Sequence, residues 1–250
     1  MTRIAIAGAT GAVGRHVVET ARGAGYETVA IARSAGVDLM TGAGLDAALD
    51  GADAVIDVSS IGALSAKASV AFFETATRNL LAAERSAGVA HHVALSIIGA
   101  VDGPSGYYAG KAAQERMLAA SGDRWSVLRA AQFHEFAAQM ARRGGIAGTV
   151  VVPRMQSQPV SAAEVALELV EIAGGGPRGL AQDLAGPLPE RMADLVRRYL
   201  RHNGSRRPVL EVRFPGPMGR VSANGGLLAG PTAKLGTQTF DEWLSDQSSS

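Results

Sequence analysis

The chain contains no cysteine, few aromatic residues and no long apolar run. Its 250 residues include no Cys, and Phe, Trp and Tyr together make up only 5%. The absence of cysteine excludes disulfides, thiolate metal sites and a cysteine nucleophile, and it fits a reducing compartment. No apolar stretch reaches the roughly 18 residues of a membrane helix, and no signal-peptide core follows Met1. We therefore expect a cytoplasmic protein without a membrane partner.

An excess of charge of either sign is also missing. The sequence has 24 Lys and Arg against 23 Asp and Glu, which gives a formal net charge of +1. No global field is available to hold a nucleic-acid backbone, so we expect a small-molecule substrate and no nucleic-acid partner. The length and the 47% hydrophobic content allow one sizeable core, and we expect a single domain over residues 1–250. The oligomeric state stays open.

Short apolar runs alternate with segments of helical periodicity along the first half of the chain. Parallel strands need crossover connections, so this alternation predicts an α/β protein with a doubly wound parallel sheet. The predicted strands are 3–7, 27–32, 54–58, 92–96 and 125–128, and the helices between them are 13–24, 44–49, 68–87 and 107–120.

Beyond residue 130 the alternation loosens. We predict helices at 133–142, 162–173 and 189–202 and a strand at 149–152. In a doubly wound fold, ligands bind outside the carboxyl ends of the strands. Two late segments, 133–160 and 203–236, are therefore expected to form a small region that covers the substrate.

A glycine-rich turn follows the first predicted strand and opens the first predicted helix. Gly8 suits a tight turn, Gly11 lets the backbone approach a pyrophosphate, and Gly14 allows close contact between helix and strand. The helix N-terminus offers amide groups and a positive dipole to the phosphates. The position of the turn at the start of a strand–helix–strand unit predicts a dinucleotide site. The residues expected to contact the cofactor here are Gly8, Thr10, Gly11, Ala12, Val13 and Gly14.

The end of the second predicted strand favours NADP(H) over NAD(H). An NAD site usually has an acidic residue there, which binds the ribose 2′-hydroxyl. This chain has Arg33, whose guanidinium can donate two hydrogen bonds to a 2′-phosphate, with Arg15 as a possible helper. Asp38 and Leu39 are candidates to line the adenine, although a surface turn explains Asp38 nearly as well.

Several motifs together resemble the NmrA-like group of atypical short-chain dehydrogenases/reductases. The similarity spans roughly residues 1 to 175 and is carried by the turn at 8–14, Arg33, the strand end Leu95-Ser96-Ile97-Ile98-Gly99, Tyr107-Tyr108-Ala109-Gly110-Lys111, and the segment from Trp125 to Phe133. The resemblance implies a Rossmann-type sheet, a cofactor across the strand ends and a variable C-terminal region over the substrate. Such proteins include NADPH-dependent reductases and members that bind the cofactor without turnover, so fold alone leaves function open.

The resemblance also implies catalytic roles for three residues. Tyr107 and Lys111 have a spacing that puts both side chains on one helical face. In the wider superfamily, the tyrosine donates a proton to a carbonyl, while the lysine lowers the pKa of the tyrosine and holds the nicotinamide ribose. Ser96 is the candidate for orienting the substrate oxygen. The sequence departs from the pattern there, because Ile97 and Ile98 follow where catalytic relatives usually have paired small hydroxyl residues.

Further candidates lie at the ends of other strands. Ser59 and Ser60 end the third strand and are expected to meet the pyrophosphate or ribose, with simple strand termination as the alternative. The resemblance puts the backbone of Gln132 and Phe133 around the nicotinamide amide. His134 and Glu135 could enter a substrate pocket or simply begin a helix. The pair His91-His92 lacks acidic companions at metal-ligand spacing, so we expect no metal.

Three functions fit these observations. The leading hypothesis is an NADPH-dependent oxidoreductase that moves hydride between the nicotinamide and a carbonyl or quinone-like small molecule. The second is a redox-sensing regulator that binds NADP(H) without chemistry, and the third is an epimerase or dehydratase that retains its cofactor. The sequence does not identify the substrate.

Overall fold

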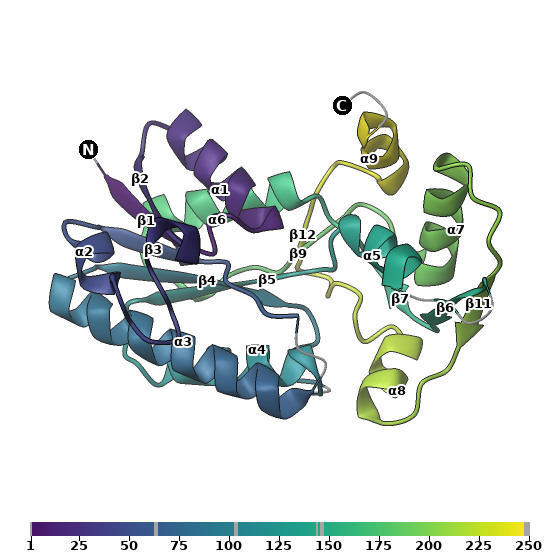
Figure 1. Ribbon diagram of the computed structural model, residues 1–250, viewed down its shortest axis with the longest axis horizontal. Coiled ribbons are helices and arrows are strands. Elements are labelled where there is room, and N and C mark those ends of the chain that lie inside the picture. Colours follow the sequence, from purple (N-terminus) through teal and green to yellow (C-terminus); the bar gives the residue numbers. More distant parts are fainter. Residues whose placement is uncertain (1, 63–64, 103–104, 144, 146–147, 248–250) are drawn as a thin grey trace. The chain divides into compact units, whose positions relative to one another are not determined.

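The chain folds into two compact units in the computed structural model, which describes residues 2–62, 65–102, 105–143, 145 and 148–247 (Figure 1). The first unit comprises residues 1–129 and 162–181, and the second comprises residues 130–161 and 182–250. The two segments expected to cover the substrate, 133–160 and 203–236, both fall in the second unit, and residues 144, 146 and 147 lie outside the described part. Their covering role stays a prediction.

The strands of the first unit form a parallel sheet in the order β8-β5-β4-β3-β1-β2. Nearly every residue of the central strands is buried, which is typical of parallel strands covered on both faces. The strand bounds are β1 Arg3–Ala7, β2 Glu27–Ile31, β3 Ala54–Asp57, β4 His91–Ile97, β5 Trp125–Ala130 and β8 Gly179–Leu180. The strands predicted from the sequence are confirmed within a few residues.

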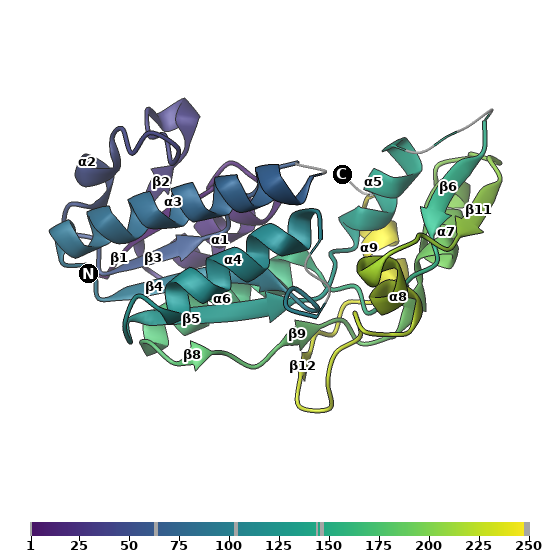
Figure 2. The same cartoon turned by 90° about the horizontal axis from the view of Figure 1, so that it is seen from below.

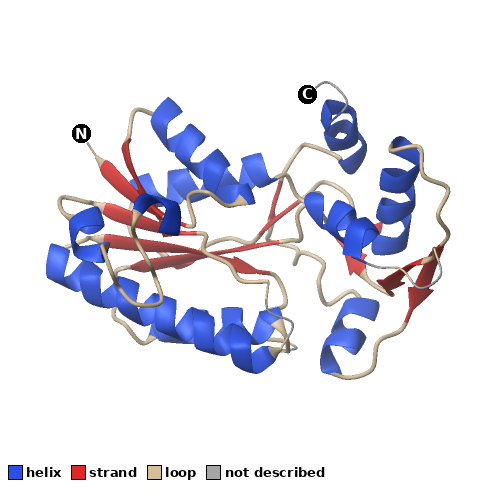
Figure 3. Cartoon of the chain, in the orientation of Figure 1, coloured by secondary structure: helices blue, strands red, loops and turns tan. Residues whose placement is uncertain are grey.

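Helices cover both faces of this sheet (Figure 3). On one face α1 (Ala12–Gly23) packs against α6 (Ala162–Gly175). On the other, α3 (Ala66–Ala87) lies along α4 (Tyr107–Ala119), with α2 (Leu45–Leu49) beside α3 (Figures 1 and 2). The predicted doubly wound α/β fold is therefore confirmed.

The strand order creates a topological switch point between β1 and β3. From β1 the chain passes to β2 on one side, and it then crosses to β3 on the other side. The classic dinucleotide-binding order has a further strand beyond β2. Within the described residues β2 is the edge strand, because the chain runs from it through the short 3-10 helix η1 (Arg33–Ala35) and α2 directly to β3. Ligands bind at switch points in such sheets, outside the carboxyl ends of the strands.

The second unit contains short strands and four helices among its described residues. It comprises α5 (Glu135–Arg143), β6 (Val150–Pro153), β7 (Gln156–Ser157), β9 (Leu184–Ala185), β10 (Glu190–Arg191), α7 (Met192–His202), β11 (Val209–Val212), α8 (Pro217–Ala223), β12 (Lys234–Leu235) and α9 (Phe240–Gln247). Strand β6 pairs with β11, β7 with β10, and β9 with both β12 and Ala130. No helix in the described part of either unit is long and apolar enough to cross a bilayer.

Two predictions for this unit were incomplete. The helix predicted from Pro189 begins only at Met192, because Glu190 and Arg191 pair with Ser157 and Gln156. No helix or strand was predicted in the segment 203–236, which contains β11, α8 and β12.

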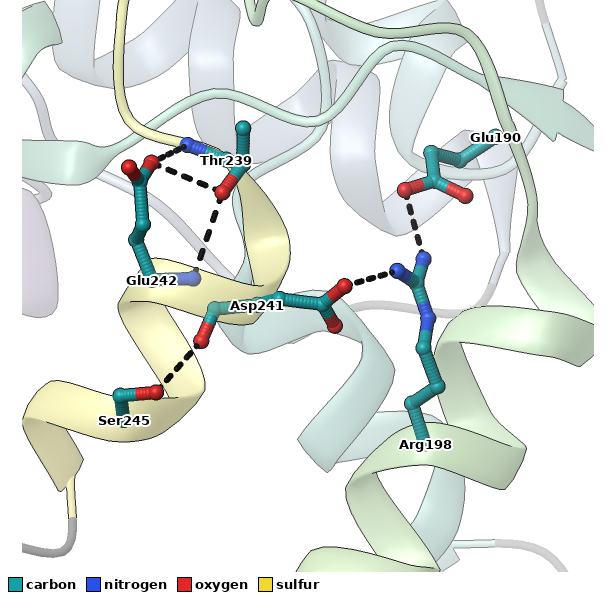
Figure 4. A network of polar contacts seen from close by, with 6 residues as sticks. All are labelled: Glu190, Arg198, Thr239, Asp241, Glu242 and Ser245. Carbon is teal, nitrogen blue, oxygen red and sulfur yellow. Dashed lines mark hydrogen bonds and ion pairs between the residues drawn. The ribbon is translucent and has the colours of Figure 1, made fainter.

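An ion pair connects the C-terminal helix α9 to α7, and a cap stabilises the start of α9 (Figure 4). Arg198 of α7 pairs with Glu190 at 2.6 Å and with Asp241 at 2.9 Å, and its guanidinium lies 5.1 Å from the centroid of the Phe240 ring. At the start of α9, the Glu242 carboxylate accepts hydrogen bonds from the Thr239 amide and hydroxyl, as in a capping box. These contacts fix the last helix within its unit.

A buried ion pair connects α3 to β4 in the first unit. The Glu84 carboxylate lies 2.7 Å from Nδ1 of His92, and both side chains are less than one-tenth exposed. Burial alone would lower the pKa of His92, but the charge and hydrogen bond of Glu84 raise it overall. The histidine therefore keeps its proton to a higher pH in the folded state than in the unfolded state.

The buried pair predicts a specific pH dependence of stability. A raised folded pKa adds stability that is fully present below the ordinary His pKa of 6.5 and is lost as pH rises through the folded value. We expect the free energy of unfolding of the wild type to fall more steeply as pH rises above 6.5 than that of Glu84→Gln, as measured by urea denaturation. The exposed variant Glu19→Gln serves as the control, and equal pH slopes in wild type and Glu84→Gln would contradict the assignment.

Candidate functional site

The glycine turn brings the end of β1 against the end of β3. Gly8 has φ of +82°, and a Cβ there would lie 2.9 Å from the Ser59 Cα and the Val58 carbonyl oxygen. A Cβ on Gly14 would lie 2.1 Å from the Gly8 carbonyl oxygen, so only glycine lets α1 approach the turn this closely. The structure thus gives Gly8 and Gly14 the conformational roles that the sequence predicted for them.

The first turn of α1 presents backbone amides at the switch point. Gly11 is the N-cap residue, and no described side chain caps the helix there. Thr10 is exposed, Ala12, Val13 and Gly14 form the first turn, and the Thr10 carbonyl oxygen accepts a hydrogen bond from Arg15 at 3.2 Å. The first amides of a helix lack internal partners and favour an anion such as pyrophosphate.

Ser59 adds a buried hydroxyl group next to the Gly8 turn. Its side chain is 4% exposed, and its Oγ has no hydrogen-bond partner among the described residues. Such a group is costly to bury unless something binds it. The close glycine turn, the uncapped helix and the orphan hydroxyl together fit a dinucleotide phosphate.

The residues predicted for the adenosine end lie beyond β2. Arg33 begins η1 and is exposed. Asp38 closes a local turn, because its carboxylate accepts the Met40 amide at 2.7 Å, and Leu39 packs partly buried against the core. The surface-turn alternative thus accounts for the observed contact of Asp38. Contact of these residues with a cofactor stays a prediction.

A buried polar chain crosses from β3 to β4 through α4. Asp57, fully buried, accepts the Ser59 amide at 2.8 Å on one oxygen and the Gln114 side-chain amide at 2.8 Å on the other. The Gln114 oxygen accepts a hydrogen bond from the Lys111 Nζ at 2.8 Å, and the same Nζ donates to the Leu95 carbonyl oxygen at 2.7 Å. Burial lowers the pKa of Lys111 to about 8, against the opposing attraction of Asp57. Lys111 is thus held within the fold.

Tyr107 is the first residue of α4, and its phenol contacts the Ser60 hydroxyl. The Ser60 hydroxyl donates a hydrogen bond to the Tyr107 oxygen at 3.3 Å, and the Tyr107 ring packs edge-on against Phe73. The family resemblance implied that Lys111 lowers the pKa of Tyr107. The pKa is instead raised to about 12, because burial outweighs the hydrogen bond from Ser60 and the nearby Asp57 charge adds to the increase. At neutral pH the phenol is protonated.

Ser96 serves a different contact from the one expected. Its hydroxyl is buried and donates to the Glu115 carboxylate at 2.5 Å. The same carboxylate forms an ion pair with Arg129 at 2.6 Å. The catalytic role predicted for Ser96 therefore has no supporting contact, and Ser60 is the hydroxyl that reaches Tyr107.

The predicted nicotinamide residues belong to the second unit. The Gln132 side chain is buried and accepts the Ser157 hydroxyl at 2.5 Å, while Phe133 forms a bridge with Val160. His134 contacts the Gln238 carbonyl oxygen at 3.2 Å, and Glu135 begins α5. Their roles toward a cofactor or substrate stay predictions.

Neither histidine of the pair at 91–92 joins a metal-like cluster. His91 contacts the Ser126 hydroxyl at 2.8 Å, and burial lowers its pKa, whereas His92 pairs with Glu84. Within the described ranges, no three His, Asp or Glu side chains lie together in a way that could hold a metal ion.

Asp57 and Gln114 are site residues that the sequence analysis missed. A carboxylate within the apolar strand Ala54–Asp57 was the available signal, because a charged group in a buried strand requires partners. Gln114 offered no signal, since its role depends on the packing of α4 over β3.

Comparison with known proteins supports the geometry. A family model described as NAD(P)H-binding matches residues 8–174. The structure resembles the NADPH-dependent quinone oxidoreductase of Escherichia coli in complex with NADPH, with a TM-score of 0.73 and 20% identity over 98% of this chain and 99% of that chain. It also resembles UDP-N-acetylglucosamine 4-epimerase of Bacillus cereus, with a TM-score of 0.71 and 15% identity over 98% of both chains. At these identities the likeness shows the fold alone. No curated protein matches the sequence significantly.

The glycine geometry predicts contrasting effects of two alanine substitutions in α1. Gly14→Ala forces a methyl group into the turn backbone, so we expect a loss of about 1–3 kcal/mol in stability and at least a tenfold weaker affinity for NADPH. Gly23→Ala adds a methyl group in open space, with nothing within 4 Å, and should stabilise the helix by about 0.5–1 kcal/mol. Thermal unfolding and NADPH fluorescence titration measure both effects. Equal behaviour of the two variants would contradict the close approach at Gly14.

Proposed function

Because this chain belongs to the NAD(P)H-binding family, whose model matches residues 8–174, we propose that it is an NADPH-dependent oxidoreductase. Its substrate is a small molecule with a carbonyl or quinone-like group. The observation that carries the proposal is the hydrogen bond of 3.3 Å between the Ser60 hydroxyl and the Tyr107 phenol. Ser60 directly follows Ser59, whose backbone packs against Gly8. A protonated acid group thus lies next to the turn that suits the cofactor phosphates.

The residues of the chain supply orientation and a proton. When bound, NADPH supplies a hydride, which carries two electrons to the acceptor carbon. Tyr107 donates its hydroxyl proton to the acceptor oxygen, so that a new O–H bond forms as the phenol O–H bond breaks. The amides at the start of α1 and the Ser59 hydroxyl hold the phosphates.

A quinone-like acceptor is supported by the likeness to the NADPH-dependent quinone oxidoreductase. Reduction of a quinone needs a hydride and a proton, and the protonated Tyr107 phenol is a group that can supply the proton. Arg33 supports NADPH over NADH, because an exposed guanidinium after β2 can pair with a 2′-phosphate. The comparisons leave the cofactor preference open.

A second candidate function is an NADP(H)-binding redox sensor without turnover. It is favoured by the contacts of the other two expected catalytic residues, since Ser96 binds Glu115 and Lys111 binds Leu95 and Gln114. A panel of quinones and aldehydes separates the two candidates. Loss of NADPH absorbance with any acceptor favours the reductase, and no turnover combined with at least a tenfold difference in affinity between NADPH and NADP⁺ favours the sensor.

Removal of the Tyr107 hydroxyl tests the proposed chemistry. We expect Tyr107→Phe to lower kcat about 10²–10⁴-fold with the best acceptor, because the general acid is lost, and to leave the Kd for NADPH within about twofold. Stopped-flow measurement of NADPH oxidation gives the rate. Full activity in this variant would overturn the role of Tyr107, even if reduction itself were retained.

The arginine after β2 tests the cofactor preference. Arg33→Ala should weaken NADPH binding about 10- to 100-fold and leave NADH binding nearly unchanged, because only NADPH carries the 2′-phosphate. Arg85→Ala, another exposed arginine in the first unit, is the matched control. Calorimetric titration with both cofactors measures the effect, and an equal loss for NADPH and NADH would exclude a 2′-phosphate contact.

A further inference from the structure

The Tyr107 hydroxyl has one polar contact to the described part of the chain. The Ser60 Oγ donates to it at 3.3 Å, which leaves the phenol proton free to point elsewhere. A phenol that accepts from one hydroxyl can donate to a substrate oxygen at the same time. Ser60 is itself exposed, so its own proton exchanges with water.

The groups expected to assist Tyr107 are engaged with other partners. Lys111 is 3% exposed, donates to Leu95 and Gln114, and lies 4.2 Å from the centroid of the Phe73 ring. Ser96 donates to Glu115. Among the described residues, neither the Lys111 ammonium nor the Ser96 hydroxyl binds the phenol oxygen, whereas the Ser60 hydroxyl binds it.

The fold fixes both members of the pair. Tyr107 is held by its edge-on contact with Phe73 and by the hydrogen bond of its carbonyl oxygen with the Ser69 hydroxyl at 3.1 Å. One turn along α4, a Cβ on Gly110 would lie 2.2 Å from that same hydroxyl, so α3 and α4 are in close contact there. On the other side, Asp57 binds the Ser59 amide and fixes the backbone just before Ser60.

On the basis of the proposed reductase function, we propose that Ser60 is a positioning residue that orients the Tyr107 phenol and returns a proton to it after each turnover. As Tyr107 gives its proton to the substrate oxygen, the Ser60 hydroxyl stabilises the phenolate by its hydrogen bond. The Ser60 O–H bond then breaks as the Tyr107 O–H bond forms again. In the same concerted step the Ser60 oxygen accepts a proton from a hydronium ion of the solvent, so that neither a serine alkoxide nor a hydroxide is left, and no electrons move.

The electrostatic surroundings agree with this role. Burial raises the pKa of Tyr107, the hydrogen bond from Ser60 lowers it, and the Asp57 charge on β3 raises it. From α3 the uncharged Phe73 ring packs against the Tyr107 ring, and Ser69 binds the Tyr107 carbonyl oxygen. On α4 the Lys111 ammonium is held by Gln114 and Leu95. Ser60 is thus the contact that favours the ionised phenol.

The test measures the phenol directly and does not depend on turnover. All four tyrosines are replaced by 3,5-difluorotyrosine, whose phenol is intrinsically more acidic, and Tyr107 is assigned in the ¹⁹F NMR spectrum by its absence in Tyr107→Phe. We expect Ser60→Ala to raise the Tyr107 pKa by about half a unit to one unit, the size of one lost hydrogen bond. Ser60→Thr keeps the hydroxyl and should restore the wild-type value, and Ser86→Ala on the exposed part of α3 is the control.

The outcomes separate this proposal from the proposed function. A raised pKa in Ser60→Ala, with rescue by threonine and a kcat pH profile displaced in the same direction, supports Ser60. An unchanged pKa in a folded Ser60→Ala variant overturns the proposal, whether or not the protein reduces quinones. If no variant turns over NADPH but the pKa still shifts, the reductase function fails while the hydrogen bond stands, and the return of the proton in turnover is then excluded.

Discussion

The contact between the Gly8 turn and the end of β3 is the constraint on which the rest of the site depends. Its distances are so short that a Cβ at Gly8 would meet the backbone of Ser59 and Val58. Glycine is required there for a second reason, because the turn has a positive φ. This contact sets the distance between two strand ends, and the residues of the glycine turn, Ser59 and Ser60 all follow one of those ends.

Asp57 connects the backbone at this contact to the side chains around it. A buried carboxylate is unfavourable unless its oxygens are hydrogen-bonded, and here one oxygen binds the Ser59 amide while the other binds Gln114. The first bond shapes the turn that presents Ser59 and Ser60, and the second leads to Lys111. The same residue therefore orders both the turn beside Gly8 and the surroundings of Tyr107. This explains why a single acidic residue stands in an otherwise apolar strand.

The fold and the family could be predicted from the sequence, but the hydrogen-bond partners of the site side chains could not. The alternation of apolar runs and helical periods predicted β1 to β5 and α1 to α4, and the predicted NAD(P)-binding resemblance is confirmed by the match over residues 8–174. The glycine turn was accessible because its spacing reflects local backbone geometry. The partners of Ser96 and Lys111 were not accessible, because they depend on how α4 lies over β3 and β4. The short pairings of β7 and β10 were missed because two-residue strands carry no periodicity.

The spacing of Tyr107 and Lys111 does not by itself determine what the two side chains contact or what they do. Residues four apart on a helix share a face, but the space above that face decides what each side chain meets. Here the first residue of α4 lies at the carboxyl edge of the sheet beside an exposed serine, whereas Lys111, one turn deeper, is surrounded by Phe73, Leu95 and Gln114. The hydrogen bond from the Lys111 ammonium to the Leu95 carbonyl oxygen connects α4 to β4, and the one to Gln114 stays within α4. The same spacing therefore leaves the Tyr107 phenol at the edge of the sheet while Lys111 is held inside the fold, and the hydroxyl group that contacts the phenol follows β3 instead of lying on β4.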